Sequence, residues 1–475
     1  MGNTHEHAAE IDELVAIVGS ANVLTGDDAS PQLVDWRNVH HGTAVAVVRP
    51  GSSEEVAAVV RWCAANDVVV VTQGGNTGLS GGQIPMNAKP TVVLSLARMN
   101  QIVEVDAEGW TMTVQSGVTI EAMQEAAAAG QRLFAPDWGA RGTATIGGAI
   151  ATDAGGNNVV RYGNTRDQIL GLEVVLADGE IWDGLRALRK DSSGYDIKHL
   201  FVGSEGTLGV VTQAVVKLHP ATPFQQTAMV SLSRLDKLME LFALANEVVP
   251  DAVLAFELMP EVAVARACEL FEITHPMQVR SEFYVLVRLA AAQPVTERLG
   301  AFLEQGAEAG LISDAVVAST AEQEQRLWKI REEMPAKSLW PQYNTHGLKM
   351  DTAVPIARMG EYHNAVCAIA EELVPGALSY GFGHVGDGNC HMAVLPISDD
   401  QVEPFLAVKA ELNRRIDEMS FALGATLSAE HGVGRELRHR VAGQKPDVEW
   451  KMMHAVKAAL DPDGRFNPGV LLPDG

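Results

Sequence analysis

The feature that most constrains this chain is an apolar strand that runs directly into a glycine-rich loop. Residues Val68–Thr72 read as a buried strand, and the loop Gln73–Gly82 that follows has five glycines in its last nine residues. Upstream, Thr43–Arg49 reads as a strand, and the capping box Ser52–Glu55 opens a helix. Residues 43–72 therefore predict a βαβ unit with a glycine loop at the end of its second strand.

The glycine loop is suited to phosphate binding, because backbone N–H groups without side-chain bulk can surround a pyrophosphate. Asn76, Thr77 and Ser80 add hydrogen-bonding side chains. The spacing is neither GxGxxG nor GxxxxGKS/T, and a tight hairpin explains one such loop equally well. Two further clusters, Gly139–Gly156 and Gly203–Gly209, also adjoin regular structure. Three such loops favour one extended ligand, with a phosphate chain and a flat ring system, over three unrelated turns.

A change in composition near Pro220–Gln225 marks a domain boundary, because the glycine-dense character ends there. The segment that follows alternates strands with helices that have charged faces. This pattern predicts an α+β layer in which helices cover one side of an antiparallel sheet. Ser233 is expected to cap a helix that continues to residue 248. We expect three parts, at residues 1–222, 223–424 and 425–475.

Composition and charge exclude several classes of protein. The formal charge of −24 and the lack of a Lys/Arg run argue against a nucleic-acid partner. No apolar stretch approaches the ~20 residues that a membrane helix needs. The N-terminal residues lack the apolar core of a signal peptide, and Cys63, Cys268, Cys367 and Cys390 have no paired spacing, as in reduced thiols. We therefore expect a cytoplasmic protein without a transmembrane segment.

The most specific local signal runs from Gly383 to His391, where two histidines flank a glycine turn. His384 and His391 stand at the two shoulders of this turn between strands, so both rings can point at one spot. Glu430 would add an oxygen ligand from a separate loop. Two His and one carboxylate make a divalent-cation site with positions left for water or substrate, and we favour this over structural histidines. Asp387 fits a turn residue better than a ligand.

Three other polar residues are weaker candidates. His431 faces away from Glu430 if the segment is extended, and a general base and a packed structural histidine explain it equally well. Arg331 lies late on a predicted helix at 320–333, where the alternative is a surface cation or a cation that interacts with the helix dipole. Lys349 lies in an apolar strand-like run, so it must reach solvent, pair with an acid or bind an anion.

The order of these elements resembles the flavoprotein family of vanillyl-alcohol oxidase and p-cresol methylhydroxylase, in its D-2-hydroxyacid dehydrogenase branch. Five separate motifs occur in the family's order, and the resemblance extends from Arg49 to Gly469. It implies an α+β fold with an FAD-binding domain of two α/β subdomains (residues 1–222). An α+β cap, or substrate, domain (223–424) and a C-terminal segment that returns to the FAD domain (425–475) complete it.

The resemblance also implies which residues contact FAD. Ala149 and Asp153 replace two asparagines of the family's pattern, which puts side-chain bonds at these positions in doubt and leaves the glycine path intact. The histidine that carries a covalent flavin in some relatives has no evident counterpart, so we expect non-covalent FAD. The implied FAD contacts are Gln73, Gly74, Gly75, Asn76, Thr77, Gly78, Ser80, Pro136, Asp137, Gly142, Thr145, Ile146, Gly147, Gly148, Thr152, Gly155, Gly156, Gly206, Val210 and Asn467.

At the catalytic centre the resemblance assigns metal binding to His384, His391 and Glu430, and the role of general base to His431. The substrate would chelate the metal through its hydroxyl and one carboxylate oxygen, lose the hydroxyl proton to His431 and pass the α-hydride to flavin N5. The implied substrate contacts are Arg331, Lys349, His384, Asn389, His391 and His431.

Lys349 matches a lysine of the hydroxyglutarate members of the branch and therefore favours D-2-hydroxyglutarate as the substrate. Pro335 and Ala393 depart from the pattern of those members, so a D-lactate dehydrogenase is the alternative. A non-catalytic flavin-binding protein with a structural metal is a further alternative. For the metal, zinc is the first choice, with manganese and cobalt next. The expected electron acceptor is an electron-transfer flavoprotein or a quinone, and the oligomeric state is open, a homodimer included.

Overall fold

The computed structural model describes residues 6–473, with side chains from residue 11 onward. Residues 1–5, which begin the stretch read above as lacking a signal peptide, lie outside the described residues. The chain divides into two compact units. Unit 1 comprises residues 1–156, 163–220 and 430–475, and unit 2 comprises residues 157–162 and 221–429.

The short segment 157–162 groups with unit 2 although it lies within the first expected domain. It contains α5 (Val159–Tyr162), and Arg161 of this helix donates from Nη1 to the Ala290 carbonyl at 2.5 Å. Among residues 6–473, no helix is both long and apolar enough to cross a membrane.

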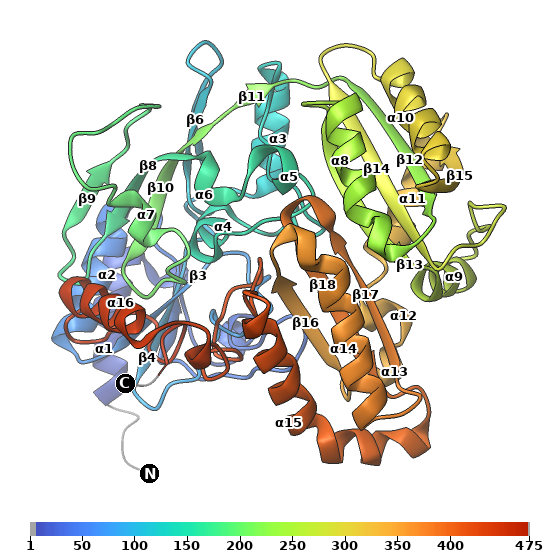
Figure 1. Ribbon diagram of the computed structural model, residues 1–475. Coiled ribbons are helices and arrows are strands. Elements are labelled where there is room, and N and C mark those ends of the chain that lie inside the picture. Colours follow the sequence, from blue (N-terminus) through green and yellow to red (C-terminus); the bar gives the residue numbers. More distant parts are fainter. Residues whose placement is uncertain (1–5, 474–475) are drawn as a thin grey trace. The chain divides into compact units, whose positions relative to one another are not determined.

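Unit 1 contains a four-stranded sheet built around the predicted βαβ unit (Figure 1). Helix α2 (Ser53–Ala65) begins as expected, because the Ser52 hydroxyl accepts from the Glu55 N–H. The two strands that this helix connects are not neighbours, since each pairs in parallel with β4 between them. The sheet order is β1 (Val23–Leu24), β2 (Ala46–Val48), β4 (Thr91–Ser95) and β3 (Val69–Gln73), and α1 (Glu6–Val18) also belongs to this subdomain.

A five-stranded antiparallel sheet forms the second subdomain of unit 1. Its order is β5 (Ile102–Asp106), β6 (Thr111–Gln115), β10 (Val210–Lys217), β8 (Ile169–Val175) and β9 (Ile181–Gly184). Its hydrophobic core includes residues of α3 (Ile120–Ala129) and α4 (Ile146–Thr152). Shorter elements are β7 (Arg132–Leu133), α6 (Thr165–Gln168), α7 (Lys198–Phe201) and β11 (His219–Pro220).

The C-terminal segment returns to unit 1, as the fold prediction required. After α16 (Asp447–Leu460), the chain runs beside β3, where the Val70 N–H donates to the Arg465 carbonyl and the Asn467 N–H donates to the Val70 carbonyl. Phe466 packs in the core of the four-stranded sheet.

Unit 2 is built on one seven-stranded sheet in which every neighbouring pair is antiparallel. Strand β12 was not predicted, and it pairs with β14 over its whole length. The sheet order is β15 (Ile312–Val317), β12 (Phe224–Leu232), β14 (Phe283–Ala291), β13 (Val253–Pro260), β17 (Leu378–His384), β18 (Asn389–Leu395) and β16 (Leu348–Ala353).

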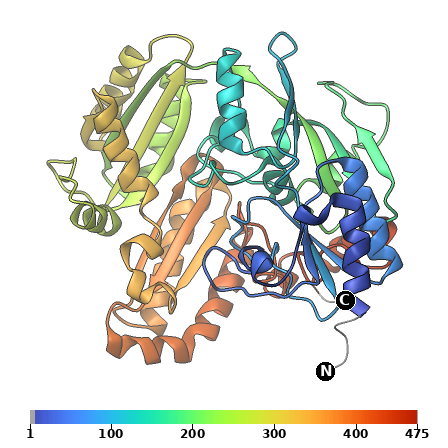
Figure 2. The ribbon, with the colours of Figure 1, turned by 180° about the vertical axis from the view of Figure 1, so that it is seen from behind.

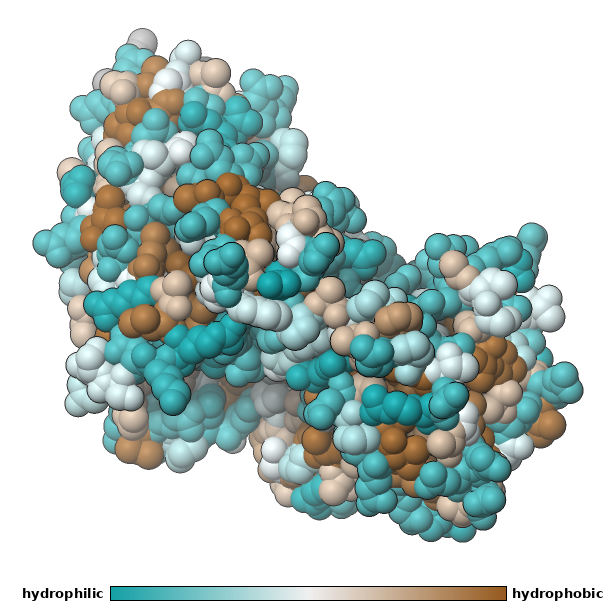
Figure 3. All heavy atoms as spheres, turned by 90° about the horizontal axis from the view of Figure 1, so that it is seen from above, coloured by the Kyte–Doolittle hydropathy of each residue, from teal (hydrophilic) through white to brown (hydrophobic). Residues whose placement is uncertain are grey.

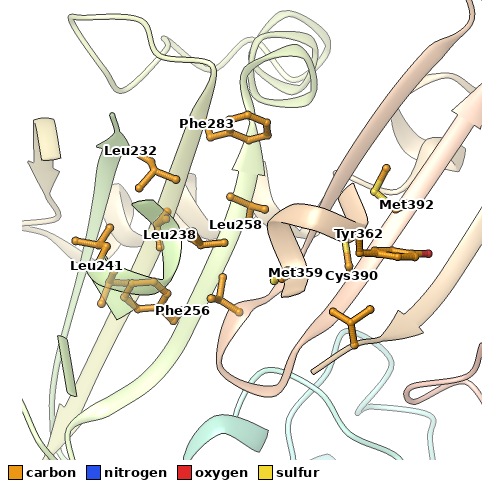
Figure 4. Close-up of a cluster of buried hydrophobic side chains, with 14 of the residues drawn as sticks. Leu232, Leu238, Leu241, Phe256, Leu258, Phe283, Met359, Tyr362, Cys390 and Met392 are labelled. Carbon is orange, nitrogen blue, oxygen red and sulfur yellow. The ribbon is translucent and has the colours of Figure 1, made fainter. Parts of the chain in front are cut away.

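Helices cover both faces of this sheet, so the expectation of a sheet covered on one side was wrong. Alternate residues of β14 enter different cores: Phe283 and Val285 enter one, and Tyr284 and Leu286 the other. The first core, drawn in Figure 4, includes residues of α8 (Leu238–Val248), α10 (Thr296–Glu308), α14 (Met359–Leu373) and α15 (Asp399–Ala422). The second core includes residues of α9 (Glu261–Leu270), α11 (Ala321–Glu332) and α12 (Ala336–Leu339), and Figure 2 shows this part from behind.

The predicted cap at Ser233 was also wrong. A 3-10 turn at Leu235–Lys237 precedes α8, which begins at Leu238 without a side-chain cap. The surface seen from above mixes hydrophilic areas with separate hydrophobic patches (Figure 3). Scattered exposed apolar residues of this kind are normal for a globular protein.

Candidate active site

A cavity of about 590 Å³ in unit 1 brings the three glycine clusters together. Its walls come from the loop after β3, from the segment that leads into and includes α4, and from the turn before β10. The C-terminal segment adds Glu430, His431 and Asn467. The predicted flavin contacts that line it are Gly74, Gly75, Asn76, Thr77, Gly78, Ser80, Thr145, Gly147, Gly148, Thr152, Gly155, Gly156, Gly206 and Asn467.

Two glycines of the first loop are required by close packing beneath the cavity. A Cβ on Gly75 would lie 2.0 Å from the Thr143 carbonyl oxygen, and a Cβ on Gly74 would lie 2.3 Å from the Thr145 hydroxyl. Neither backbone can therefore carry a side chain in this position. The first glycine loop and the segment that leads into α4 therefore pack backbone against backbone, and we call this surface the glycine cradle. A side chain on Gly74 or Gly75 would push the two segments apart.

Four polar atoms of cavity-lining residues are buried without a hydrogen-bond partner among the described residues. They are Thr72 Oγ1, Asn76 Oδ1, Ser116 Oγ and Asn467 Oδ1. Buried polar atoms are nearly always hydrogen-bonded, so these atoms identify a surface that binds a polar ligand or ordered water. Together with the glycine cradle, they fit an extended ligand that carries phosphates.

Six predicted flavin contacts do not line the cavity. The Gln73 amide donates to the Gln32 and Gln83 carbonyls, and the Pro136 carbonyl accepts from Gln124 Nε2. Asp137 is paired with Arg141 at 2.9 Å. The side chains of Ile146 and Val210 are buried in hydrophobic cores, and Gly142 completes the six.

The two departures from the family's pattern differ in consequence. Ala149 is buried in α4 and lines the cavity. Asp153 ends α4 with a left-handed backbone, and its carboxylate accepts from the Arg166 N–H and the Arg166 Nε. The side chain of Asp153 therefore connects the end of α4 to Arg166 and stabilises the loop between them.

Several cavity residues were missed by sequence reasoning. Trp36 lies far upstream in the sequence, and nothing in its neighbourhood signalled a site. Trp138 and Glu205 lie inside the glycine clusters, but those clusters were interpreted only for their glycines. An aromatic or acidic residue inside a glycine loop was the available signal. The other missed residues that line the cavity include Leu96, Ser116, Phe201, Ser204 and Val211.

Glu205 connects the third glycine loop to the C-terminal segment. Its two carboxylate oxygens accept the N–H groups of Val433 and Gly434, each at 2.8 Å, and its carbonyl accepts from Asn467 Nδ2. On the other side of the segment, the Ser80 hydroxyl donates to the Gly432 carbonyl at 2.8 Å. Burial raises the pKa of Glu205 to about 7, although the two N–H groups act in the opposite direction.

The raised pKa of Glu205 predicts a pH-dependent stability. In the folded state this carboxyl holds its proton at pH values where it is ionised in the unfolded chain, so stability falls as pH rises from about 4.5 to 7. The free energy of unfolding should change by roughly 3 kcal/mol across this range. The melting temperature of the flavin-free protein should fall less steeply across this range in Glu205→Gln. Equal slopes in both proteins would contradict the prediction.

A second group of polar residues lies on one face of the sheet in unit 2. Glu257 on β13 is the cross-strand neighbour of His384 on β17, and the His384 Nδ1 lies 2.8 Å from Glu257 Oε1. Arg331 of α11 contacts the other oxygen of the same carboxylate, through Nε at 2.8 Å and Nη2 at 2.7 Å. Burial opposes ionisation of Glu257, but His384 and Arg331 lower its pKa to about 2. The carboxylate is thus ionised, and its two oxygens are shared between His384 and Arg331.

His391 on β18 has a similar neighbour. Asp351 of β16 is its cross-strand partner, with Nδ1 3.6 Å from Oδ1. The Asn389 amide donates to the same Asp351 oxygen at 2.9 Å, and the Asn389 Oδ1 is buried without a partner among the described residues. The rings of His384 and His391 are 5.7 Å apart, centroid to centroid. This donor set of two imidazoles backed by carboxylates suits a divalent cation.

The two predicted cations of the substrate site differ in their surroundings. Arg331 is buried, so the alternative of a surface cation was wrong. It lies over the Phe382 ring, 5.0 Å from its centroid. Lys349 is exposed on the edge strand β16 and donates to the Asn344 carbonyl. Asp387 accepts from the Asn389 N–H and is a turn residue, as its position predicted.

Comparison with known proteins finds two families along the chain. Residues 44–184 match the FAD binding domain family, and residues 222–471 match the C-terminal domain of FAD linked oxidases. A D-2-hydroxyglutarate dehydrogenase of Xanthomonas citri pv. viticola is 36% identical over 444 residues, covering 92% of this chain and 91% of the relative. The mitochondrial D-2-hydroxyglutarate dehydrogenase of Bos taurus is 34% identical over 97% of this chain and 84% of its own length.

Among solved structures, p-cresol methylhydroxylase with substrate bound superimposes with a TM-score of 0.74. The match covers 99% of this chain and 98% of that one at 18% sequence identity. At this identity the likeness concerns the fold alone. It agrees with the expected p-cresol methylhydroxylase type of architecture.

Proposed function

Because this chain belongs to the FAD-linked oxidases, we propose that it is a dehydrogenase that oxidises D-2-hydroxyglutarate to the 2-oxo acid. The observation that carries the proposal is the similarity, over most of the chain, to relatives named for that activity. The glycine-lined cavity of unit 1 and the polar sheet face of unit 2 supply residues of the types that such a reaction needs.

The residues that would hold FAD are those of the glycine cradle and the cavity around it. Support comes from Gly74 and Gly75, which leave no room for a side chain, and from the buried polar atoms that lack partners. When bound, FAD supplies the two-electron acceptor that takes the hydride at N5. We expect FAD to be non-covalent, and acid precipitation should then release the yellow colour into solution.

His384, His391 and Glu430 would hold a divalent cation, with zinc as first choice and manganese or cobalt next. Support comes from the rings of His384 and His391, which lie 5.7 Å apart, centroid to centroid, in unit 2. Glu430 comes from the second motif that the sequence pairs with these histidines. When bound, the cation supplies a Lewis acid that favours loss of the hydroxyl proton.

The chain's own residues would orient the substrate and move its proton. His431 would take the hydroxyl proton on a ring nitrogen, and Arg331 would pair with the carboxylate next to the reacting carbon. Arg331 is pre-oriented, because Glu257 fixes its Nε and Nη2 in place. Lys349 and Asp351 are two positions apart on β16, so their side chains lie on the same face of the sheet. From this face Lys349 would pair with the distal carboxylate of the substrate.

The second candidate is D-lactate, which lacks a distal carboxylate. In its favour, the Lys349 ammonium already donates to Asn344, and Ala393 and Pro335 stand where hydroxyglutarate members have polar contacts. D-lactate would use the same Arg331 and His431.

The two candidates are distinguished by anaerobic bleaching of the flavin with D- and L-hydroxy acids. We expect D-2-hydroxyglutarate to bleach the wild type and L-isomers not to. In Lys349→Ala, the affinity for D-2-hydroxyglutarate should fall roughly 10- to 150-fold, because a charge-assisted hydrogen bond is lost. The affinity for D-lactate should not change. Lys409→Ala is the matched control, because Lys409 of α15 also donates to a backbone carbonyl. Equal losses for both acids in Lys349→Ala would favour D-lactate.

A non-catalytic flavin-binding protein would remain yellow with every acid in this panel, and that result would defeat the proposed function. An electron-transfer flavoprotein or a quinone as acceptor, a cytoplasmic location and a homodimer stay predictions. Reoxidation of the bleached flavin by each acceptor would decide between the first two.

A further inference from the structure

Glu257 is an acidic residue in the middle of an otherwise apolar strand. All eight residues of β13 are buried, and Glu257 is 1% exposed. A buried carboxylate is retained only where partners compensate for its lost hydration. The partners here are His384 and Arg331, which are both placed in the proposed site.

The two oxygens of Glu257 have separate tasks. Oε1 lies 2.8 Å from His384 Nδ1, and Oε2 receives both Nε and Nη2 of Arg331. A carboxylate has no proton to give, so the neutral imidazole must donate from Nδ1. The register of β13 and β17 places these side chains directly opposite each other, so the contact is built into the sheet.

A proton on Nδ1 decides which nitrogen of His384 can bind a cation. A neutral imidazole has one nitrogen that carries a proton and one nitrogen with a lone pair. When the protonated nitrogen is held in a hydrogen bond, the nitrogen with the lone pair is left to bind a cation. The ring of His384 therefore presents Nε2 as its ligand atom. The orientation of the His384 ring is set as well, because the contact at Nδ1 limits its rotation.

We propose that Glu257 is a positioning residue that holds His384 in the Nδ1–H form and orients it, with Arg331, for the bound cation and substrate. This inference rests on the proposed function, since it assigns the second ligand layer of the same cation site. Glu257 is almost completely buried, so it would act through His384 and Arg331 and not by contact with the substrate.

The test uses Glu257→Gln in the full FAD-loaded protein. The glutamine amide keeps an oxygen for Arg331 but turns its NH2 group toward His384, which must then accept at Nδ1 and carry its proton on Nε2. Mn²⁺ affinity, measured by titration, should fall roughly 10- to 100-fold, as is usual when the outer partner of a metal histidine is lost. Glu257→Asp keeps the charge and should lose less.

The matched control is Glu324→Gln. Glu324 lies on α11 of the same unit and pairs with Arg288 at 2.9 Å, so this variant also removes a carboxylate that pairs with an arginine. Mn²⁺ affinity should not change in this variant. An unchanged affinity in folded Glu257→Gln, judged by its melting temperature, would overturn the inference.

A second measurement does not depend on a Glu257 variant. Nitrogen NMR of the metal-free, histidine-labelled wild type should show His384 protonated on Nδ1, with assignment from the signal lost in His384→Ala. Protonation on Nε2 would overturn the inference while leaving the proposed reaction intact. A wild type that binds no Mn²⁺ would instead contradict the proposed cation site, and with it this role of Glu257.

Discussion

His391→Ala is expected to abolish turnover while FAD stays bound. The imidazole projects from the sheet of unit 2, whereas the glycine cradle lies in unit 1, so removing the ring leaves the residues of the cradle untouched. Loss of the cation removes several kcal/mol of transition-state stabilisation, which corresponds to roughly 10³-fold or more in rate. His384→Ala should behave in the same way, because His384 also belongs to unit 2. Glu430→Ala should also abolish turnover, but Glu430 lines the cavity, so its FAD content is a separate measurement. The flavin absorbance of each purified variant, read beside its turnover, separates the two effects.

The control for these variants is His346→Ala, which removes a histidine of unit 2 outside the proposed site. It should retain wild-type turnover. Chelators should inactivate the wild type, and added Zn²⁺, Mn²⁺ or Co²⁺ should restore it, with the most effective ion identifying the metal. Full turnover in protein shown to be metal-free would remove the cation from the mechanism.

The parts of the fold that sequence reasoning predicted depend on neighbouring residues. The capping box that starts α2 lies within four residues, and the glycine loop adjoins the strand that precedes it. Such signals are local, so they can be recognised in the sequence without knowledge of the tertiary structure. The same holds for the turn between His384 and His391, where Gly388 takes a positive φ of 76°.

The partners of the candidate site depend on distant residues instead. Glu257 bonds Arg331 across 74 residues of sequence and His384 across 127. No periodicity brings these residues together, because sheet order decides which strands are neighbours. The acidic residue in the apolar run of β13 was an available signal that a partner must exist, but the sequence around it could not indicate which one.

Lys349 illustrates how strand order changes the meaning of a residue. In the sequence it interrupts an apolar run, which predicted a lysine that reaches solvent, pairs with an acid or binds an anion. The run forms the edge strand β16, and a lysine on an edge is exposed and discourages pairing with other strands. The same residue is therefore compatible with a purely structural role, and this is why its substitution is the test of substrate choice.

His431→Ala is expected to lose roughly 10²–10⁴ in kcat, the usual worth of a positioned general base. The ring belongs to a cavity-lining segment whose backbone is fixed independently of it. The Ser80 hydroxyl donates to the Gly432 carbonyl, and Glu205 accepts from Val433 and Gly434. Removing the imidazole should therefore leave the segment in place, with FAD and Mn²⁺ affinities equal to those of the wild type.

Added imidazole should restore part of the lost rate in His431→Ala, because a small base can enter the space that the side chain leaves. His439→Ala is the matched control, since His439 is an exposed histidine of the same C-terminal segment, and it should keep full activity. The expectation that His431 faces away from Glu430 was wrong, because the Oε1 of Glu430 lies 3.5 Å from His431 Nε2. If His431→Ala lost both turnover and Mn²⁺, His431 would be supporting the cation site through Glu430. A loss in kcat alone, rescued by imidazole, would leave proton transfer as its role.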